Sequence, residues 1–218
     1  MGPVAGGPSP TGGLAFGVSA PDLTAAFAAF DAANARDPRT ELVDGAPQPV
    51  ELAYARRMSA RLDAYAPDAP DALRLAARAQ HLERWTIPRS DYPMDRPGYH
   101  AWRTALKAYH ARRAGELLRE LGFGDGLIER VGFLLEKRRL KRDADTQTLE
   151  DVICHVFLLH YAEEFAADHA PARVVAILRK TWGKMSDRGR AAALALPLAP
   201  GVRALVERAL AGESAVGG

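Results

Sequence analysis

The chain has 218 residues, of which 48% are hydrophobic, and 29 Lys and Arg residues stand against 27 Asp and Glu residues, giving a formal net charge of +2. This composition is typical of a soluble globular protein of one domain, and the balanced charge does not by itself indicate nucleic-acid binding. The single cysteine, Cys154, excludes an intrachain disulfide and a cysteine-rich zinc knuckle. Because this fits a reducing compartment and no apolar run reaches the roughly 18 residues of a membrane span, we expect a cytoplasmic protein without a membrane partner.

The spacing of apolar residues predicts helices along most of the chain. The Gly- and Pro-rich segment 1–18 predicts a disordered tail, residues 19–211 a single domain, and residues 212–218 a second flexible tail. The predicted helices, in chain order, cover residues 19–37, 50–65, 71–85, 99–122, 125–142, 149–169, 171–185 and 187–196, with a short last helix after residue 200. Residues 39–49 predict a polar loop with a turn at Asp44-Gly45. We therefore expect an all-α fold of about eight helices around a single core.

The stretch "AQHLERWTIPRSDYPMDRPGYHAWR", residues 79–103, interrupts the helices with prolines, aromatic residues and arginines. Guanidinium groups bind phosphate and carboxylate bidentately, and aromatic rings stack on a base or on an arginine. We predict that Arg84, Arg89 and Arg103 contact an anionic substrate. Tyr92 and Trp102 are predicted to shape its pocket. The alternative is a loop held to the core by its own aromatic side chains, with ion pairs between its arginines and aspartates.

Two further basic clusters extend this prediction. Residues 137–142, "KRRLKR", lie at the end of a predicted helix, and "RKTWGKMSDRG", residues 179–189, places Lys184 close to Trp182. We assign Lys137 to the substrate contacts. As an alternative, residues 137–142 form a solvated helix tip or a surface that binds the phosphates of RNA. Residues 179–189 either pack beside the site or form another basic surface.

Histidines and carboxylates on separate predicted helices are candidate metal ligands. His110 lies on the apolar face of its helix, and His81 lies directly before the arginine-rich loop. Asp151 and Glu51 lie near the starts of two other helices. Divalent Zn, Mn, Fe and Ni accept such mixed nitrogen and oxygen ligands inside a helical bundle. We therefore predict that His81, His110 and Asp151 bind a divalent metal, with Glu51 as a fourth possible ligand.

A metal-bound water would be a nucleophile for hydrolysis, with Glu150 and Asp151 as the catalytic carboxylates and Glu150 orienting the water or acting as general base. The structural alternative remains open for every one of these residues. An inward-facing histidine such as His155 is often a hydrogen-bonded core residue, and an acidic residue in a first helical turn favours the helix dipole.

Several segments resemble the DUF4202 domain family, a family without an assigned activity. They include "FDAANARDP", "ELAYARRMSARL", "RAQHLERWTIPRSDYPMDRPGYHAWR", "HARRAGELLRELGF", "KRRLKRDADTQTLEDV" and "RKTWGKMSDRG". The resemblance covers about residues 22–196, and the run of Arg, Trp, Pro and Tyr residues in the third segment is its most specific part.

The layout is also similar to that of the HD-domain metal-dependent phosphohydrolases, which are helical and bind metal through a His, a His-Asp doublet and a distal Asp. This resemblance implies an HD-like helical bundle in which His81, His110 and Asp151 are ligands. The sequence departs from the pattern in two places. The doublet is Gln80-His81, and Glu51 stands at the position of the first His.

We therefore expect a metal-dependent hydrolase that acts on a small phosphorylated or nucleotide-like anion. A non-catalytic protein that binds RNA or a nucleotide is the first alternative. An HD-type oxygenase with bound iron is the second.

Overall fold

The computed structural model describes Gly2 and residues 22–214, so most of the predicted tail 1–18 and the end of the predicted tail 212–218 lie outside the described residues. The first half of the fold contains α1 (Leu23–Asn34), β1 (Thr40–Val43), β2 (Ala46–Pro49), α2 (Val50–Tyr65), α3 (Asp71–Arg78) and α4 (Arg96–Glu120). The second half contains α5 (Asp125–Leu135), α6 (Ala144–His160), α7 (Ala162–Ala167), α8 (Pro171–Lys184), α9 (Asp187–Leu194) and α10 (Pro200–Ser214). The fold is therefore mainly helical, as predicted. No helix among the described residues is both long enough and apolar enough to cross a bilayer.

Three predicted helices differ most from the structure. α3 ends at Arg78, and two 3₁₀ turns, Arg84–Thr86 and Arg89–Asp91, lie in the arginine-rich loop that follows it. α5 ends at Leu135 because the next residues leave helical geometry, with positive φ angles at Lys137, Arg139 and Lys141. The predicted helix 149–169 is divided into α6 and α7 by Tyr161, whose φ of −128° is not helical.

The predicted polar loop 39–49 is a short antiparallel hairpin. Asp44 and Gly45 form its turn with φ angles of 52° and 80°, and Thr40 pairs with Pro49. The pairing continues to the start of α2, where the Val50 N–H donates to the Arg39 carbonyl oxygen at 3.1 Å. The hairpin therefore holds Arg39 beside the first turn of α2.

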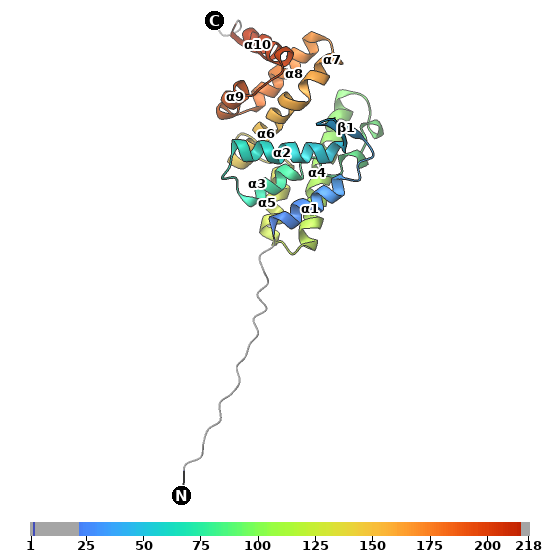
Figure 1. The fold of residues 1–218 in the computed structure, drawn as a ribbon, viewed down its shortest axis with the longest axis vertical. Helices are drawn as coiled ribbons and strands as arrows, with labels where there is room; N and C mark the ends of the chain where they lie inside the picture. The colour runs from blue at the N-terminus through green and yellow to red at the C-terminus, as the bar shows by residue number, and fades with distance from the viewer. Residues whose placement is uncertain (1, 3–21, 215–218) are drawn as a thin grey trace.

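Buried apolar side chains form two clusters, where the sequence analysis expects one core. The first cluster joins α1 to α6, and the second joins α6 to α8, α9 and α10. Figure 1 shows the helices from α7 onward gathered at one end of the molecule, beyond α6. α6 contributes Leu149, Val152 and Val156 to the first cluster and Cys154 and Leu158 to the second. It is therefore the element through which the two clusters are joined.

Candidate functional site

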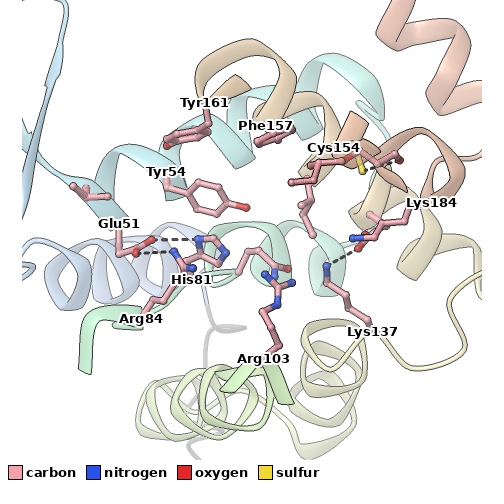
Figure 2. A pocket seen from close by; sticks show the side chains of 16 residues that line it. Glu51, Tyr54, His81, Arg84, Arg103, Lys137, Cys154, Phe157, Tyr161 and Lys184 are labelled. Atoms are coloured by element: carbon pink, nitrogen blue, oxygen red, sulfur yellow. Dashed lines mark hydrogen bonds and ion pairs between the residues drawn. The ribbon is translucent and has the colours of Figure 1, made fainter. Parts of the chain in front are cut away.

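A pocket of about 300 Å³ lies where α2, the end of α3, α4, α6 and α8 meet. One part of its wall is apolar and includes Tyr54, Phe157 and Tyr161. The ionisable side chains that line it, apart from His81, Cys154 and the tyrosines, are Glu51, Arg84, Arg103, Lys137, Glu150 and Lys184. Figure 2 shows Glu51, His81 and Arg84 on one side, Lys137 and Lys184 on the other, and Arg103 between them.

His81 and Glu51 form a buried pair at one side of the pocket. His81 Nδ1 lies 3.3 Å from Glu51 Oε2, and the imidazole is stacked on Tyr54 with ring centroids 3.9 Å apart. Burial lowers the pKa of His81 to about 4, and the cations Arg84 and Arg103 act in the same direction, whereas Glu51 opposes them. The imidazole is therefore neutral at pH 7. Because the Glu51 carboxylate can only accept, the His81 proton lies on Nδ1 and the lone pair on Nε2 (Figure 2).

The local fold fixes the Glu51 carboxylate, whose side chain is 1% exposed. Arg39 Nη2 donates to Glu51 Oε1 at 2.8 Å, and the Glu51 N–H donates to Asp37 Oδ2 at 3.2 Å. Arg39 also donates twice to Asp37, which fixes the orientation of the guanidinium. Burial opposes ionisation of Glu51, but the contacts with His81, Arg84 and Arg39 outweigh it and lower its pKa to about 2.

Arg103 is the cation of the pocket without a protein partner. Its guanidinium makes no hydrogen bond or ion pair within residues 22–214. Arg84, in contrast, lies 3.8 Å from Glu51 Oε1 and stacks on the Trp102 ring at 5.1 Å from the ring centroid. The donors of Arg103 are therefore available to a ligand in the pocket.

Lys137 and Lys184 share the carboxylate of Glu150 on the opposite side of the pocket. Lys137 Nζ donates to Glu150 Oε2 at 2.5 Å, and Lys184 Nζ lies 3.6 Å from Oε1. Burial lowers the pKa of Lys137 despite the attraction of Glu150. For Glu150, the two lysines outweigh burial and lower the pKa of the carboxyl. Burial and the ion pair thus act in opposite directions on the pKa of Lys137, whereas the two lysines favour the ionised form of Glu150.

His110 lies behind His81 rather than in the pocket wall. The two ring centroids are 6.1 Å apart, and His110 is 3% exposed. His110 Nδ1 is 2.8 Å from the Leu82 carbonyl oxygen and therefore carries the proton that this oxygen accepts. Burial, reinforced by His81, lowers the pKa of His110 to about 3, so that this imidazole is also neutral at pH 7.

The structure does not bring Asp151 to the two histidines. Its carboxylate accepts from Tyr65 Oη at 2.9 Å, from Gln147 Nε2 at 3.0 Å and from the N–H and Oγ of Ser186 at 2.8 and 2.5 Å. Ser186 is the N-cap of α9, so Asp151 anchors the start of that helix. His155 is likewise committed, because Arg61 donates to its Nδ1 and its Nε2 donates to the Gly189 carbonyl oxygen.

These positions bear on the predicted metal site. Among the described residues, no three His, Cys, Asp or Glu side chains lie in an arrangement that could hold a metal ion. Glu51 and His81 are adjacent, but Asp151 has four protein donors and does not line the pocket. The four predicted ligands therefore do not form one metal-binding group.

The predicted substrate contacts separate into two groups. Arg84, Arg103 and Lys137 line the pocket. Arg89 instead donates to the carbonyl oxygens of its own loop, at 2.9 Å for Tyr92 and 2.6 Å for Pro93. Trp102 Nε1 donates to the Ile87 carbonyl oxygen at 2.9 Å, and neither Tyr92 nor Trp102 lines the pocket. Trp102 thus holds the loop through its indole N–H and supports Arg84 through its ring.

Sequence reasoning missed the neutral part of the pocket wall. It includes Tyr54, Gln80, Phe157, Tyr161 and Thr181. Tyr54 lies one helical turn after Glu51, and Phe157 and Tyr161 lie one and two turns after Ile153, also in the wall. This helical spacing is the available signal, but it is the same signal that any core-facing helix gives.

The family model for the domain of unknown function DUF4202 matches residues 24–206. The chain belongs to the DUF4202 family. The match includes every charged side chain of the pocket named above. Neither the curated proteins nor the solved structures contain a match to this chain.

Proposed function

We propose that the pocket binds a small phosphorylated anion and that the protein hydrolyses its phosphate ester. The observation that carries this proposal is Arg103, whose guanidinium faces the middle of the pocket and has no partner among residues 22–214. A guanidinium offers up to five N–H donors in a planar fork that matches phosphate oxygens. A bound phosphate would supply the acceptors that Arg103 lacks.

The charge of the pocket supports a dianion. Four Lys and Arg side chains and two carboxylates line the pocket, which is a formal charge of +2 when His81 is neutral. A phosphate monoester carries a charge between about −1.5 and −2 at pH 7. The apolar wall around Phe157 would accommodate the organic part of the ester, and a volume of about 300 Å³ suits a small metabolite.

The His81–Glu51 pair supports hydrolysis rather than binding alone. Water attacks the phosphorus atom and gives its proton to His81 Nε2, while Glu51 stabilises the imidazolium through Nδ1. The bond between phosphorus and the ester oxygen breaks, and the departing alcohol oxygen takes a proton from the ammonium group of Lys137, which lines the pocket. The arriving phosphate also offsets the charges of Arg84 and Arg103, which makes His81 a stronger base.

No step of this proposal passes through a metal ion, because Asp151 is committed to α9 and the predicted ligands are not grouped. The ungrouped ligands likewise give no support to an iron-dependent oxygenase. RNA binding has less support than a small anion, because Lys137 points at Glu150 and Lys141 donates to the Gly183 and Lys184 carbonyl oxygens.

Calorimetric titration with inorganic phosphate and with p-nitrophenyl phosphate tests the binding step. Arg103→Gln should weaken both ligands by about tenfold to a hundredfold, the value of a charge-assisted hydrogen bond. Arg112→Gln is the matched control, because Arg112 lies on the same helix with an exposed side chain paired to Glu116. Equal losses in the two variants would contradict the role of Arg103.

Release of p-nitrophenol tests the chemical step. His81→Gln should retain binding and lose at least about a hundredfold in kcat, the usual contribution of a general base. A chelator should not change the wild-type rate. A rate that a chelator abolishes and one divalent metal restores would refute the proposed role of His81 as base and favour the metal-dependent mechanism.

A further inference from the structure

Gln80 carries a buried hydrogen-bond acceptor in the wall of this pocket that no protein group satisfies. The residue is 4% exposed, and Oε1 has no hydrogen-bond partner among the described residues. The buried residues Ala77 and Ala79, both 0% exposed, hold the end of α3 in place around it. The neighbouring charged groups Glu51 and Glu150 are paired. Within the described residues, the pocket therefore holds one unpaired buried acceptor, Gln80 Oε1, together with unpaired donors on Arg84 and Arg103.

A buried carbonyl oxygen without a donor costs free energy, and folded proteins pair the great majority of such groups. The Gln80 side chain lines a pocket instead of lying inside a packed core, but Oε1 itself exposes less than 1 Å² of surface. A molecule in the pocket reaches this oxygen after the amide turns about its last torsion, which has a broad energy minimum. A water molecule can serve in the free protein, and a ligand that replaces it must bring its own O–H or N–H to keep the bond.

Two hydroxyl groups in the same wall indicate the same ligand chemistry. The Tyr54 and Thr181 hydroxyls make no side-chain hydrogen bond within residues 22–214. In Figure 2 the Tyr54 hydroxyl points toward the middle of the pocket. The pocket thus offers neutral polar groups from α2, from the turn after α3 and from α8 beside its cations, and an alkyl or lipid phosphate would leave these groups without partners.

We infer that Gln80 Oε1 accepts a hydrogen bond from the organic part of the bound anion, so that the substrate is the phosphate ester of a hydroxylated compound, such as a sugar phosphate. This inference rests on the proposed function, because it assumes that the phosphate group binds at Arg103. Gln80 is then the residue that selects the body of the substrate, while Arg103 selects its charge.

Calorimetry with two matched pairs of phosphate esters tests the inference. The pairs are glycerol 3-phosphate against propyl phosphate, and ribose 5-phosphate against cyclopentylmethyl phosphate. Each pair has the same charge and nearly the same size. The wild type should bind the hydroxylated member of each pair about tenfold more tightly, the value of about one neutral hydrogen bond. Inorganic phosphate is the probe for the anion site alone.

Gln80→Met keeps the length of the side chain and removes its amide. This variant should reduce the affinity ratio within each pair to nearly one, without changing the affinity for inorganic phosphate. Gln48→Met in the hairpin makes the same chemical change away from the pocket wall and should leave the preference intact. Equal binding within both pairs by the wild type, or a preference that survives in Gln80→Met, would overturn the inference while phosphate binding stands. Failure of inorganic phosphate and of every ester to bind would overturn the proposed function itself.

Discussion

Replacing Asp151 by alanine tests whether this buried carboxylate is a structural anchor or a catalytic group. Four hydrogen bonds to it, from Tyr65, Gln147 and Ser186, would be lost. A hydrogen bond to a charged group contributes about 1.5–3 kcal/mol, and donors left unpaired in the interior add a desolvation cost. Because bonds that share one acceptor are not additive, we expect Asp151→Ala to lower the free energy of unfolding by about 3–5 kcal/mol.

Urea unfolding at pH 7, followed by far-ultraviolet circular dichroism, measures this loss as a lower midpoint. Asp187→Ala is the control, because Asp187 lies in the first turn of the same helix with a fully exposed side chain, and its midpoint should equal that of the wild type. A wild-type midpoint for Asp151→Ala, together with loss of bound metal or of hydrolysis, would refute the structural role and restore the predicted metal site.

Three other predictions concern stability. His81 and His110 have lowered pKa values of about 4 and 3, so the unfolded chain binds more protons than the folded protein below about pH 6.5. The free energy of unfolding, measured with urea, should therefore fall from pH 6.5 toward pH 4 by at most about 1.4 kcal/mol per pH unit for each histidine. A free energy that does not change with pH would contradict their burial as neutral groups. Gly189→Ala should lower the melting temperature, because its Cβ would lie 2.6 Å from Asp151 Oδ1, whereas Gly183→Ala, with open space around it, should not. Gln80→Met should raise the free energy of unfolding by about 1 kcal/mol, since it removes a buried unpaired acceptor, and an unchanged urea midpoint would argue against that burial.

The helices could be predicted from apolar spacing and prolines, but the hairpin could not. Its turn at Asp44-Gly45 is visible in the sequence, yet the strands have four residues each and β2 contains two prolines, so no alternating pattern exists. The end of α5 at Leu135 could not be predicted from the sequence either. Residues 136–142 are good helix formers, but Lys137, Arg139 and Lys141 have left-handed geometry. This geometry coincides with tertiary contacts such as the Lys137–Glu150 pair, which override local propensity.

The charged residues of the candidate site could be predicted from the sequence, but the direction in which each side chain points could not. Glu51, His81, Arg84, Arg103 and Lys137 were selected as charged or titratable groups, and all line one pocket. Glu150 and Asp151 were treated together because they are adjacent. Successive residues of a helix point about 100° apart, so Glu150 faces the pocket and Asp151 faces α9. Sequence alone does not say which of two neighbouring carboxylates faces inward.

The position of α6 in both apolar clusters has a consequence for how long a ligand stays bound. α8 contributes Thr181 and Lys184 to the pocket, and it belongs to the second cluster, whereas Arg103 comes from α4 on the side of the first. An anion held between Arg103 and Lys184 therefore spans two units that meet along α6. We expect a movement of α8 away from α6 to open the pocket, and we expect a bound ligand to oppose this movement. Amide hydrogen exchange in α8 should slow in proportion to ligand saturation, so that the residence time of the ligand follows the opening rate of the C-terminal helices.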